Sequence, residues 1–393
     1  MRRILPAIVI SQFFCTSLWF AGNAILPDII RSFNLDISFL ADLTSSVQFG
    51  FIAGTLFFAV FTISDRFSPS HVFFICSIVA GAFNLGMIIQ GITPQVFLLF
   101  RFFTGFFLAG IYPVGMKIAS DYFQKGLGKS LGFLVGALVI GTALPHLLKS
   151  VTSDFPWKYV IISISALSAF GGLIMLLLVP DGPFRKKSEE LNLAAFMMAF
   201  RNKNFRASSF GYFGHMWELY TFWAFVPVML LTNKQHNGID MDVPLLSFLI
   251  IASGGLACVL SGLLSQDFGA KKLATVSLFL SCACCLASPV FLFTGSTPAL
   301  VAFLLFWGLV VIADSPMFST LVAQNAPQES RGTALTIVNC IGFSITIISI
   351  QATKLLSAHI DARYLYILLA AGPILGLISL LKYKYEKTYL GNK

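Results

Sequence analysis

The chain has 393 residues, of which 57% are apolar and only 11% are charged, and its mean hydropathy is +0.84. Soluble domains carry about 25% charged residues, so this composition excludes a soluble protein and predicts a polytopic, all-α membrane protein. The net charge of +9 does not indicate nucleic-acid binding, because the basic residues sit in short loops between apolar runs.

Twelve apolar runs are long enough to cross a bilayer, which requires about 20 residues in a helix. The first run follows a positively charged start, but it is too long for a signal-peptide core, and we interpret it as a retained span. The predicted spans lie at approximately 4–27, 39–63, 71–91, 95–120, 128–149, 157–179, 206–231, 243–266, 272–294, 297–324, 332–353 and 363–382.

Lysine and arginine predict the orientation of these spans. With an even number of spans, eighteen of the 26 basic residues fall in segments on one side and six on the other. Positive loops face the cytoplasm, so we expect both termini to be cytoplasmic and the protein to lie in the cell inner membrane.

The longest polar connection, 180–205, separates the sixth span from the seventh. Across it, like residues recur at offsets of 202 or 203: Asp65 and Asp267, Gly105 and Gly308, Pro113 and Pro316. Such a repeat indicates two six-helix halves related by an axis along the membrane normal. We therefore expect bundles over 1–180 and 206–393, joined by a cytoplasmic linker over 181–205.

Several motifs resemble those of the major facilitator superfamily of secondary transporters, over nearly the whole chain. The family's loop motif after the second span, Gly-x-x-x-Asp-Arg/Lys-x-Gly-Arg/Lys-Arg/Lys, is similar to the stretch from Gly262 to Lys272 in the second half. The first-half copy keeps Asp65 and Arg66 but has Ser68-Pro69-Ser70 in place of the glycine and the basic pair.

The fourth-span motif, Arg-x-x-x-Gly, is matched by Arg101 and Gly105. The resemblance implies two pseudo-symmetric six-helix bundles that alternate in access around a central cavity lined by spans one, four, seven and ten. It also implies a conformational latch between the halves at Asp65, Arg66 and Asp267, where an aspartate faces a helix N-terminus of the other half and its dipole.

Buried charges are costly in hydrocarbon and are functional candidates by default. Arg101, in the fourth span, can bind a carboxylate or phosphate bidentately, or it can snorkel to the interface. Lys117, sixteen residues further on, shares that face only if the helix bends near Pro113. It stands four residues before Asp121, so an ion pair is the alternative.

Three more candidates lie in the second half. His215 and Glu218 are three apart in the seventh span and so share a helix face. Histidine titrates near neutral pH, and a carboxylate at this depth is suited to proton carriage. Asp314 lies in the tenth span, two residues before Pro316. We expect these side chains to bind substrate or protons, the alternative being a satisfied buried pair that holds helices together.

Neutral residues complete the candidate site. Asn23, in the first span, is a polar candidate for the cavity, and Tyr112 and Trp217 can stack on a substrate ring, although plain packing is the alternative for both aromatics. No cofactor is expected. The seven cysteines fall inside apolar runs, and no metal site is expected.

The sequence thus predicts a proton-coupled symporter or antiporter for a small organic solute, one with an anionic group. The alternative is proton-driven efflux of lipophilic or cationic compounds, in which the acids would bind the substrate. An enzyme is disfavoured, since no HExxH, P-loop or nucleophile elbow is present. The expected partners are the substrate, protons and the lipid bilayer, and the protein is expected to act as a monomer.

Overall fold

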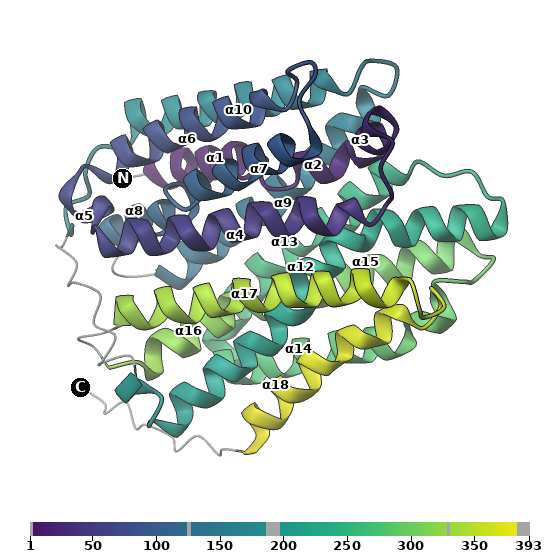
Figure 1. Cartoon of the computed structure of the whole chain (residues 1–393). Helices are drawn as coiled ribbons and strands as arrows, with labels where there is room; N and C mark the ends of the chain where they lie inside the picture. Colours follow the sequence, from purple (N-terminus) through teal and green to yellow (C-terminus); the bar gives the residue numbers. More distant parts are fainter. Residues whose placement is uncertain (1–2, 124–126, 186–196, 328–330, 383–393) are drawn as a thin grey trace.

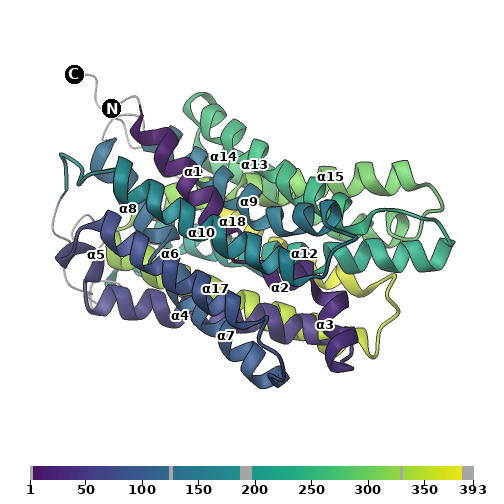
Figure 2. The ribbon, with the colours of Figure 1, turned by 90° about the horizontal axis from the view of Figure 1, so that it is seen from above.

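The computed structural model describes residues 3–123, 127–185, 197–327 and 331–382, and within these ranges it contains helices and no strand. Figure 1 shows the helices of the first half, purple to teal, gathered on one side of the molecule, and those of the second half, green to yellow, on the other. Figure 2, a view from above, shows that the helices run along one common direction.

In the described residues, the first half places its six predicted spans in ten helices. They are α1 (Ile4–Thr16), α2 (Ala21–Ala24), α3 (Leu26–Phe33), α4 (Phe39–Val60), α5 (Ile63–Arg66), α6 (Pro69–Gly86), α7 (Pro94–Leu108), α8 (Tyr112–Tyr122), α9 (Leu127–Val151) and, as the last, α10 (Lys158–Leu178). The first span is therefore broken into α1, α2 and α3, and the fourth into α7 and α8.

The second half repeats this plan. It consists of α12 (Lys203–Asn237), α13 (Val243–Phe268), α14 (Ala270–Phe291), α15 (Thr297–Ala313), α16 (Ser315–Asn325), α17 (Arg331–Ser357), a short 3-10 helix (Leu365–Ala370) and α18 (Ala371–Lys382). The tenth span breaks at Asp314, just before Pro316. A proline is tolerated in the first turn of a new helix but not within one.

Ten of the described helices or joined helices are long and apolar enough to cross a membrane. The other two predicted spans correspond to the broken α1–α3 segment and to α12, which is 35 residues long. Large apolar side chains such as Phe49, Ile75 and Leu177 are exposed on the outside of the bundle, as expected where lipid replaces water. The fold is thus an all-α, multi-pass membrane protein.

Close glycine contacts show that the halves are duplicated. A Cβ atom on Gly105 of α7 would lie 1.9 Å from the carbonyl oxygen of Val47 on α4. A Cβ atom on Gly308 of α15 would lie 2.3 Å from the carbonyl oxygen of Ile250 on α13. Both members of the second pair stand 203 residues after their counterparts, so the two halves repeat a helix-helix contact and not only a motif.

The most extensive contacts between the halves are those of α4 with α17 and of α9 with α13. Below, "the α3 end" is the end of the molecule that carries α3 and the start of α4. "The α5 end" is the opposite one, which carries α5 and the starts of α12 and α17 (Figure 1). Residues 186–196 of the predicted linker lie outside the described residues, and α12 begins at Lys203, so the domain boundaries stay a prediction.

Candidate functional site

A cavity of about 750 Å³ lies between the two halves. It extends from the α5 end to mid-depth: on α12 its lining stops at Trp223, on α4 at Thr55 and on α17 at Phe343. Pockets for small ligands commonly measure about 300–1,000 Å³, so the cavity is large enough for a small organic solute.

The walls of the cavity combine aromatic, hydroxyl and charged side chains. The aromatic members include Tyr112, Tyr212, Tyr220, Trp223 and Phe343. The charged members among the described lining residues are Lys117, Arg331 and Asp65. The described lining thus carries two cations and one carboxylate, with the hydroxyls of serine and threonine residues between them.

One face of α12 supplies much of this wall. Tyr212, Met216, Leu219, Tyr220 and Trp223 line the cavity at helical spacing. The hydroxyl of Tyr212 donates a hydrogen bond to Oδ1 of Asn339 on α17, 2.5 Å away, so the two helices also meet through a polar contact. His215 and Glu218 stand one residue before Met216 and Leu219, which turns them about 100° away from this face.

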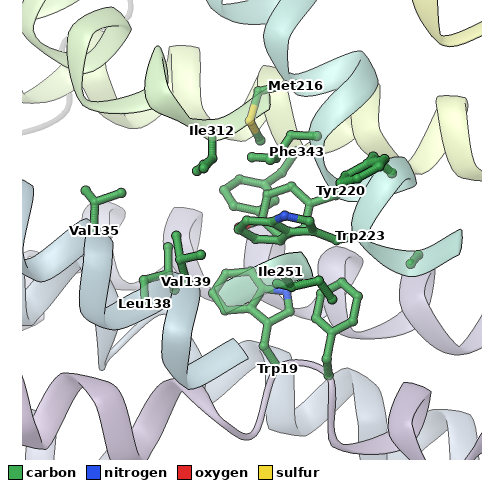
Figure 3. Packing of buried hydrophobic residues seen from close by; sticks show 14 of the residues in the cluster. Trp19, Val135, Leu138, Val139, Met216, Tyr220, Trp223, Ile251, Ile312 and Phe343 are labelled. Atoms are coloured by element: carbon green, nitrogen blue, oxygen red, sulfur yellow. The ribbon is translucent and has the colours of Figure 1, made fainter. Parts of the chain in front are cut away.

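An aromatic plug closes the cavity toward the α3 end. It consists of Trp19, Phe20, Phe51, Tyr220, Trp223 and Phe343, whose rings contact one another across the two halves. Figure 3 shows Trp19 facing Trp223 and Tyr220, with Phe343 and Met216 beside them. Trp19 and Trp223 are fully buried, so the described structure is sealed at this depth.

Polar contacts between the halves continue the seal at the α3 end. Nζ of Lys354 on α17 lies 2.8 and 2.7 Å from the two carboxylate oxygens of Asp42 on α4. The hydroxyl of Ser150 on α9 donates to Asp242, 2.6 Å away, at the start of α13. In the part of the chain that the structure describes, the cavity is thus open at the α5 end and closed at the α3 end, as one state of an alternating-access protein requires.

Lys117 and Asp65 form an ion pair in the wall of the cavity. Lys117 comes from α8, and Asp65 from the short helix α5. The break between α7 and α8 turns the fourth span before Pro113, so Lys117 and Tyr112 face the cavity while Arg101 does not. The side chains of Lys117 and Asp65 remain 19% and 11% exposed, and both are reachable from the cavity.

Arg101 is completely buried within the first half. Its guanidinium donates to the carbonyl oxygen of Leu18 at 3.0 Å and to that of Trp19, and it lies 3.4 Å from Oδ1 of Asn84. Leu18 and Trp19 fall in the break between α1 and α2. Arg101 therefore satisfies the carbonyls that this break frees, which are costly to leave unpaired in a membrane.

Glu218 is buried within the second half. Oε1 accepts a hydrogen bond from Nε1 of Trp307 at 2.6 Å and another from Sγ of Cys285 at 3.3 Å, and Oε2 accepts one from Ser281 at 2.9 Å. These donors belong to α14 and α15, behind the cavity wall. The alternative of a satisfied buried carboxylate therefore describes the contacts that Glu218 makes in this structure.

His215 and Asp314 form a buried pair, with 2.8 Å between Nδ1 and Oδ1. Asp314 occupies the break between α15 and α16, and the next residue, Ser315, lines the cavity. On the other side, the rings of His215 and Tyr212 are 6.1 Å apart, and Tyr212 also lines the cavity. The pair thus lies one layer of side chains behind the wall.

The remaining candidates face other partners. Asn23 donates to the hydroxyl of Thr44 at 2.8 Å, inside the first half. Nε1 of Trp217 donates to the carbonyl oxygen of Leu368, in the short 3-10 helix before α18. Arg66 and Asp267 are exposed at the α5 end, where Nε of Arg66 donates to the hydroxyl of Thr62.

The structure corrects one geometric expectation, that the buried charges of both halves point into one shared cavity. Tyr112, Lys117 and Asp65 line it, whereas Arg101, Glu218 and Asp314 do not. For Arg101 and Glu218 the physical reason is that a fully buried charge needs several fixed partners, which the interior of each bundle supplies. Asp314 is held behind the wall by its pair with His215. The prediction of a central cavity between the halves is confirmed.

Sequence reasoning missed Arg331, Tyr212, Tyr220 and Asn339, all of which line the cavity. A signal for the two tyrosines was present, because they share one helical face with Met216 and Trp223. No such signal marked Arg331, which begins α17. Within the described residues, no group of three or more His, Cys, Asp or Glu side chains is arranged to hold a metal ion.

Comparison with known proteins identifies the class. A family model of the Major Facilitator Superfamily matches residues 8–350, so the chain belongs to this superfamily, and it is a transporter and not an enzyme. Among curated proteins, no sequence gives a significant match.

Solved structures agree on the fold. The chain is similar to the proton:xylose symporter XylE bound to 6-bromo-6-deoxy-D-glucose, with a TM-score of 0.72 at 14% identity over 96% of this chain and 94% of that one. It is similar to the human organic anion transporter MFSD10, with a TM-score of 0.77 at 14% identity over 96% and 99%. It is also similar to the nucleoside transporter NupG, with a TM-score of 0.73 at 16% identity over 96% and 99%.

Proposed function

We propose that this transporter moves a small organic solute with an anionic group across the cell inner membrane, coupled to protons. The observation that carries the proposal is the charge of the cavity: Lys117 and Arg331 against the single carboxylate of Asp65 among the described lining residues. Lysine and arginine both bind carboxylates and phosphates, arginine with bidentate geometry. Since Arg101 already donates to Leu18 and Trp19, the anion-binding role passes to Lys117 and Arg331.

The aromatic lining supports a substrate with an apolar part. Tyr112, Tyr212, Tyr220 and Trp223 offer ring faces together with hydroxyl and indole donors, and such amphipathic side chains suit a solute that is apolar at one end. Aromatic walls would also suit efflux of lipophilic compounds. A cationic substrate, however, would meet two like charges and one carboxylate, which favours the anion.

A thermal-shift experiment on the purified protein tests this proposal. The panel contains organic acids, xylose, a nucleoside and cationic dyes, since the neighbouring folds include sugar, nucleoside and organic anion transporters. A ligand at 100 times its Kd stabilises the folded state by about 2.7 kcal/mol. We expect stabilisation by an organic acid, and we expect Lys117→Gln and Arg331→Gln to lose it.

The matched control is Lys149→Gln. Lys149 forms an ion pair with Asp28 inside the first half, 2.7 Å apart and of similar exposure to the pair of Lys117 and Asp65, but it does not line the cavity. This variant should keep the stabilisation. Hits confined to cationic dyes would favour the efflux alternative, and hits confined to neutral solutes would contradict an anionic substrate.

Proton coupling is proposed for Glu218 and for the pair of His215 and Asp314. These groups lie directly behind the residues that line the cavity, so a change in their charge can alter the packing of α12 and α16 without direct contact with the substrate. Reconstituted Glu218→Gln and Asp314→Asn proteins should exchange substrate across the membrane but lose accumulation driven by a pH gradient. Accumulation at the level of the wild type in both variants would argue against this role.

The proposed orientation places the α5 end in the cytoplasm, together with both termini. Its support is the excess of basic residues in the segments on that side, which face the cytoplasm in most membrane proteins. On this orientation, the described structure is open to the cytoplasm and closed to the outside. We also propose that the latch residues Asp65, Arg66 and Asp267 act at this end, and that the protein acts as a monomer.

A further inference from the structure

We propose that the substrate carries a neutral hydrogen-bond acceptor, such as a carbonyl oxygen, at the end opposite its anionic group, and that Trp223 and Thr55 select for this acceptor. The inference rests on the proposed function, because it takes the substrate to be an organic anion, and it narrows the substrate class. Both residues line the deep end of the cavity, which is the end next to the aromatic plug.

The indole nitrogen of Trp223 is a buried donor that has no acceptor among the described residues. Trp223 lines the cavity and is fully buried, and its Nε1 makes no hydrogen bond. Figure 3 shows the edge of the indole that carries this nitrogen on the side of Met216 and Phe343, which also line the cavity. An indole N–H can only donate, and a buried donor without a partner is costly. An acceptor on the substrate would remove that cost.

Other buried tryptophans of the second half have partners for the same group. Nε1 of Trp217 donates to the carbonyl oxygen of Leu368 at 3.1 Å, and Nε1 of Trp307 donates to Glu218 at 2.6 Å. Nε1 of Trp19 is also without a partner in the described structure, but Trp19 does not line the cavity. The indole nitrogen at the deep end is therefore the one that a ligand in the cavity can reach.

Thr55 supplies a second donor from the other half. It is the deepest lining residue on α4, its side chain is 8% exposed, and its Oγ1 has no hydrogen-bond partner among the described residues. A threonine inside a helix can donate to a carbonyl oxygen of the preceding turn, as Thr44 of the same helix does to Leu40 at 2.8 Å. Thr55 makes no such bond, so its hydroxyl can donate to a ligand. Donors without partners thus line the deep end from both halves.

The charged residues of the described lining lie away from the deep end. Arg331 begins α17, and the helix rises by about 18 Å from there to Phe343, its deepest lining residue. Lys117 lies about 7.5 Å further toward the α5 end than Tyr112 on the same helix. A second charge on the substrate would have no counterion at the deep end, where burial makes an unpaired charge costly. A neutral acceptor fits the donors that are present.

A matched pair of ligands tests this inference on the purified full chain. 4-Acetylbenzoate and 4-isopropylbenzoate have the same carboxylate, the same ring and end groups of similar shape, but only the acetyl group accepts a hydrogen bond. Isothermal titration calorimetry in detergent measures the Kd of each. We expect the wild type to bind the acetyl compound about twofold to tenfold more tightly, which corresponds to one neutral hydrogen bond.

Variants without the donors test the two residues. Trp223→Phe keeps an aromatic ring, Thr55→Val keeps the shape of the side chain, and each removes one donor. Each should lower the ratio of the two Kd values, and the double variant should bring it to about one by weakening the acetyl compound. A role in packing alone would weaken both compounds alike. The control is Trp217→Phe, which removes an indole nitrogen from the same helix that already has an acceptor, and it should keep the ratio of the wild type.

The outcomes separate the acceptor from the anion. If the wild type does not prefer the acetyl acid, or if the double variant keeps that preference, the acceptor site is overturned, whereas binding of both acids would still support an anionic substrate. If 4-acetylbenzamide, which is neutral, binds as tightly as 4-acetylbenzoate and depends equally on Trp223, the anionic substrate is overturned and the acceptor site stands. A preference for the acetyl acid that is lost in the double variant and kept in Trp217→Phe supports the proposal.

Discussion

Arg101 shows at the scale of one residue how a buried charge can serve the fold and not a ligand. The break between α1 and α2 leaves backbone carbonyls without helical partners, and the guanidinium is the donor that satisfies those of Leu18 and Trp19. Two donors from one rigid plane reach two successive carbonyls, which a lysine ammonium reproduces poorly. The side chain thus fixes the shape of the first span, where Trp19 enters the aromatic plug.

This role predicts that Arg101→Lys keeps the charge and still destabilises the protein. Hydrogen bonds to charged groups contribute about 1.5–3 kcal/mol each, and here at least one is lost in a fully buried site. The thermal midpoint in detergent should therefore fall below that of the wild type.

The thermal-shift response to the stabilising organic acid discriminates between a structural role and a substrate-binding role of Arg101. If Arg101 only satisfies the carbonyls at the break between α1 and α2, the Arg101→Lys protein should retain that response after correction for its lower midpoint. An unchanged midpoint together with a lost response would instead assign Arg101 to the substrate.

At the scale of the element, the seventh span shows what could be read from the sequence and what could not. A span with His215 and Glu218 inside it was predictable, because few charged residues interrupt so long an apolar run, although α12 (Lys203–Asn237) extends beyond the predicted 206–231 at both ends. Which face of α12 turns to the cavity was not predictable, because the free-energy cost of a buried charge can be lowered in two ways. A charge can face water, or it can face fixed donors, and Trp307, Ser281 and Cys285 supply such donors from other helices.

Gly105 and Gly308 each allow two helices to pack closely, and replacing either glycine should disturb that packing. An alanine at either position would place Cβ within 2.3 Å of a backbone carbonyl oxygen, of Val47 or of Ile250. Backbone cannot move aside as a flexible side chain can, so Gly105→Ala and Gly308→Ala should each destabilise the protein by about 1–3 kcal/mol or more, as overpacking does.

Thermal unfolding in detergent measures this effect, and Gly295→Ala is the control. Gly295 lies in the loop before α15, with no atom within 4 Å of its added Cβ, so its midpoint should not change. Because the two contacts are equivalent by duplication, the two helical variants should be destabilised to a similar degree. A neutral Gly105→Ala would contradict the close packing of α7 on α4.

At the scale of the whole molecule, the repeat at offsets of 202 and 203 was enough to predict two six-helix halves. The direction in which the cavity opens was not predictable, because an alternating-access protein uses one sequence for both states and their free energies differ by little. The contacts that select the described state are long-range ones, such as Lys354 with Asp42 and the aromatic plug. Arg331 was missed for the same reason, since its importance arises only where α17 begins beside the cavity.

The orientation of the molecule gives the last prediction. Asp154, between α9 and α10, is exposed at the α3 end, and Arg201, before α12, is exposed at the α5 end. In intact cells, a membrane-impermeant maleimide should label Asp154→Cys, whereas Arg201→Cys should react only after the membrane is permeabilised. The native cysteines are buried and give little background. The reverse pattern would mean that the basic loops do not set the topology, and the described state would then be open to the outside, so that substrate would first meet Lys117 and Asp65 from the opposite compartment.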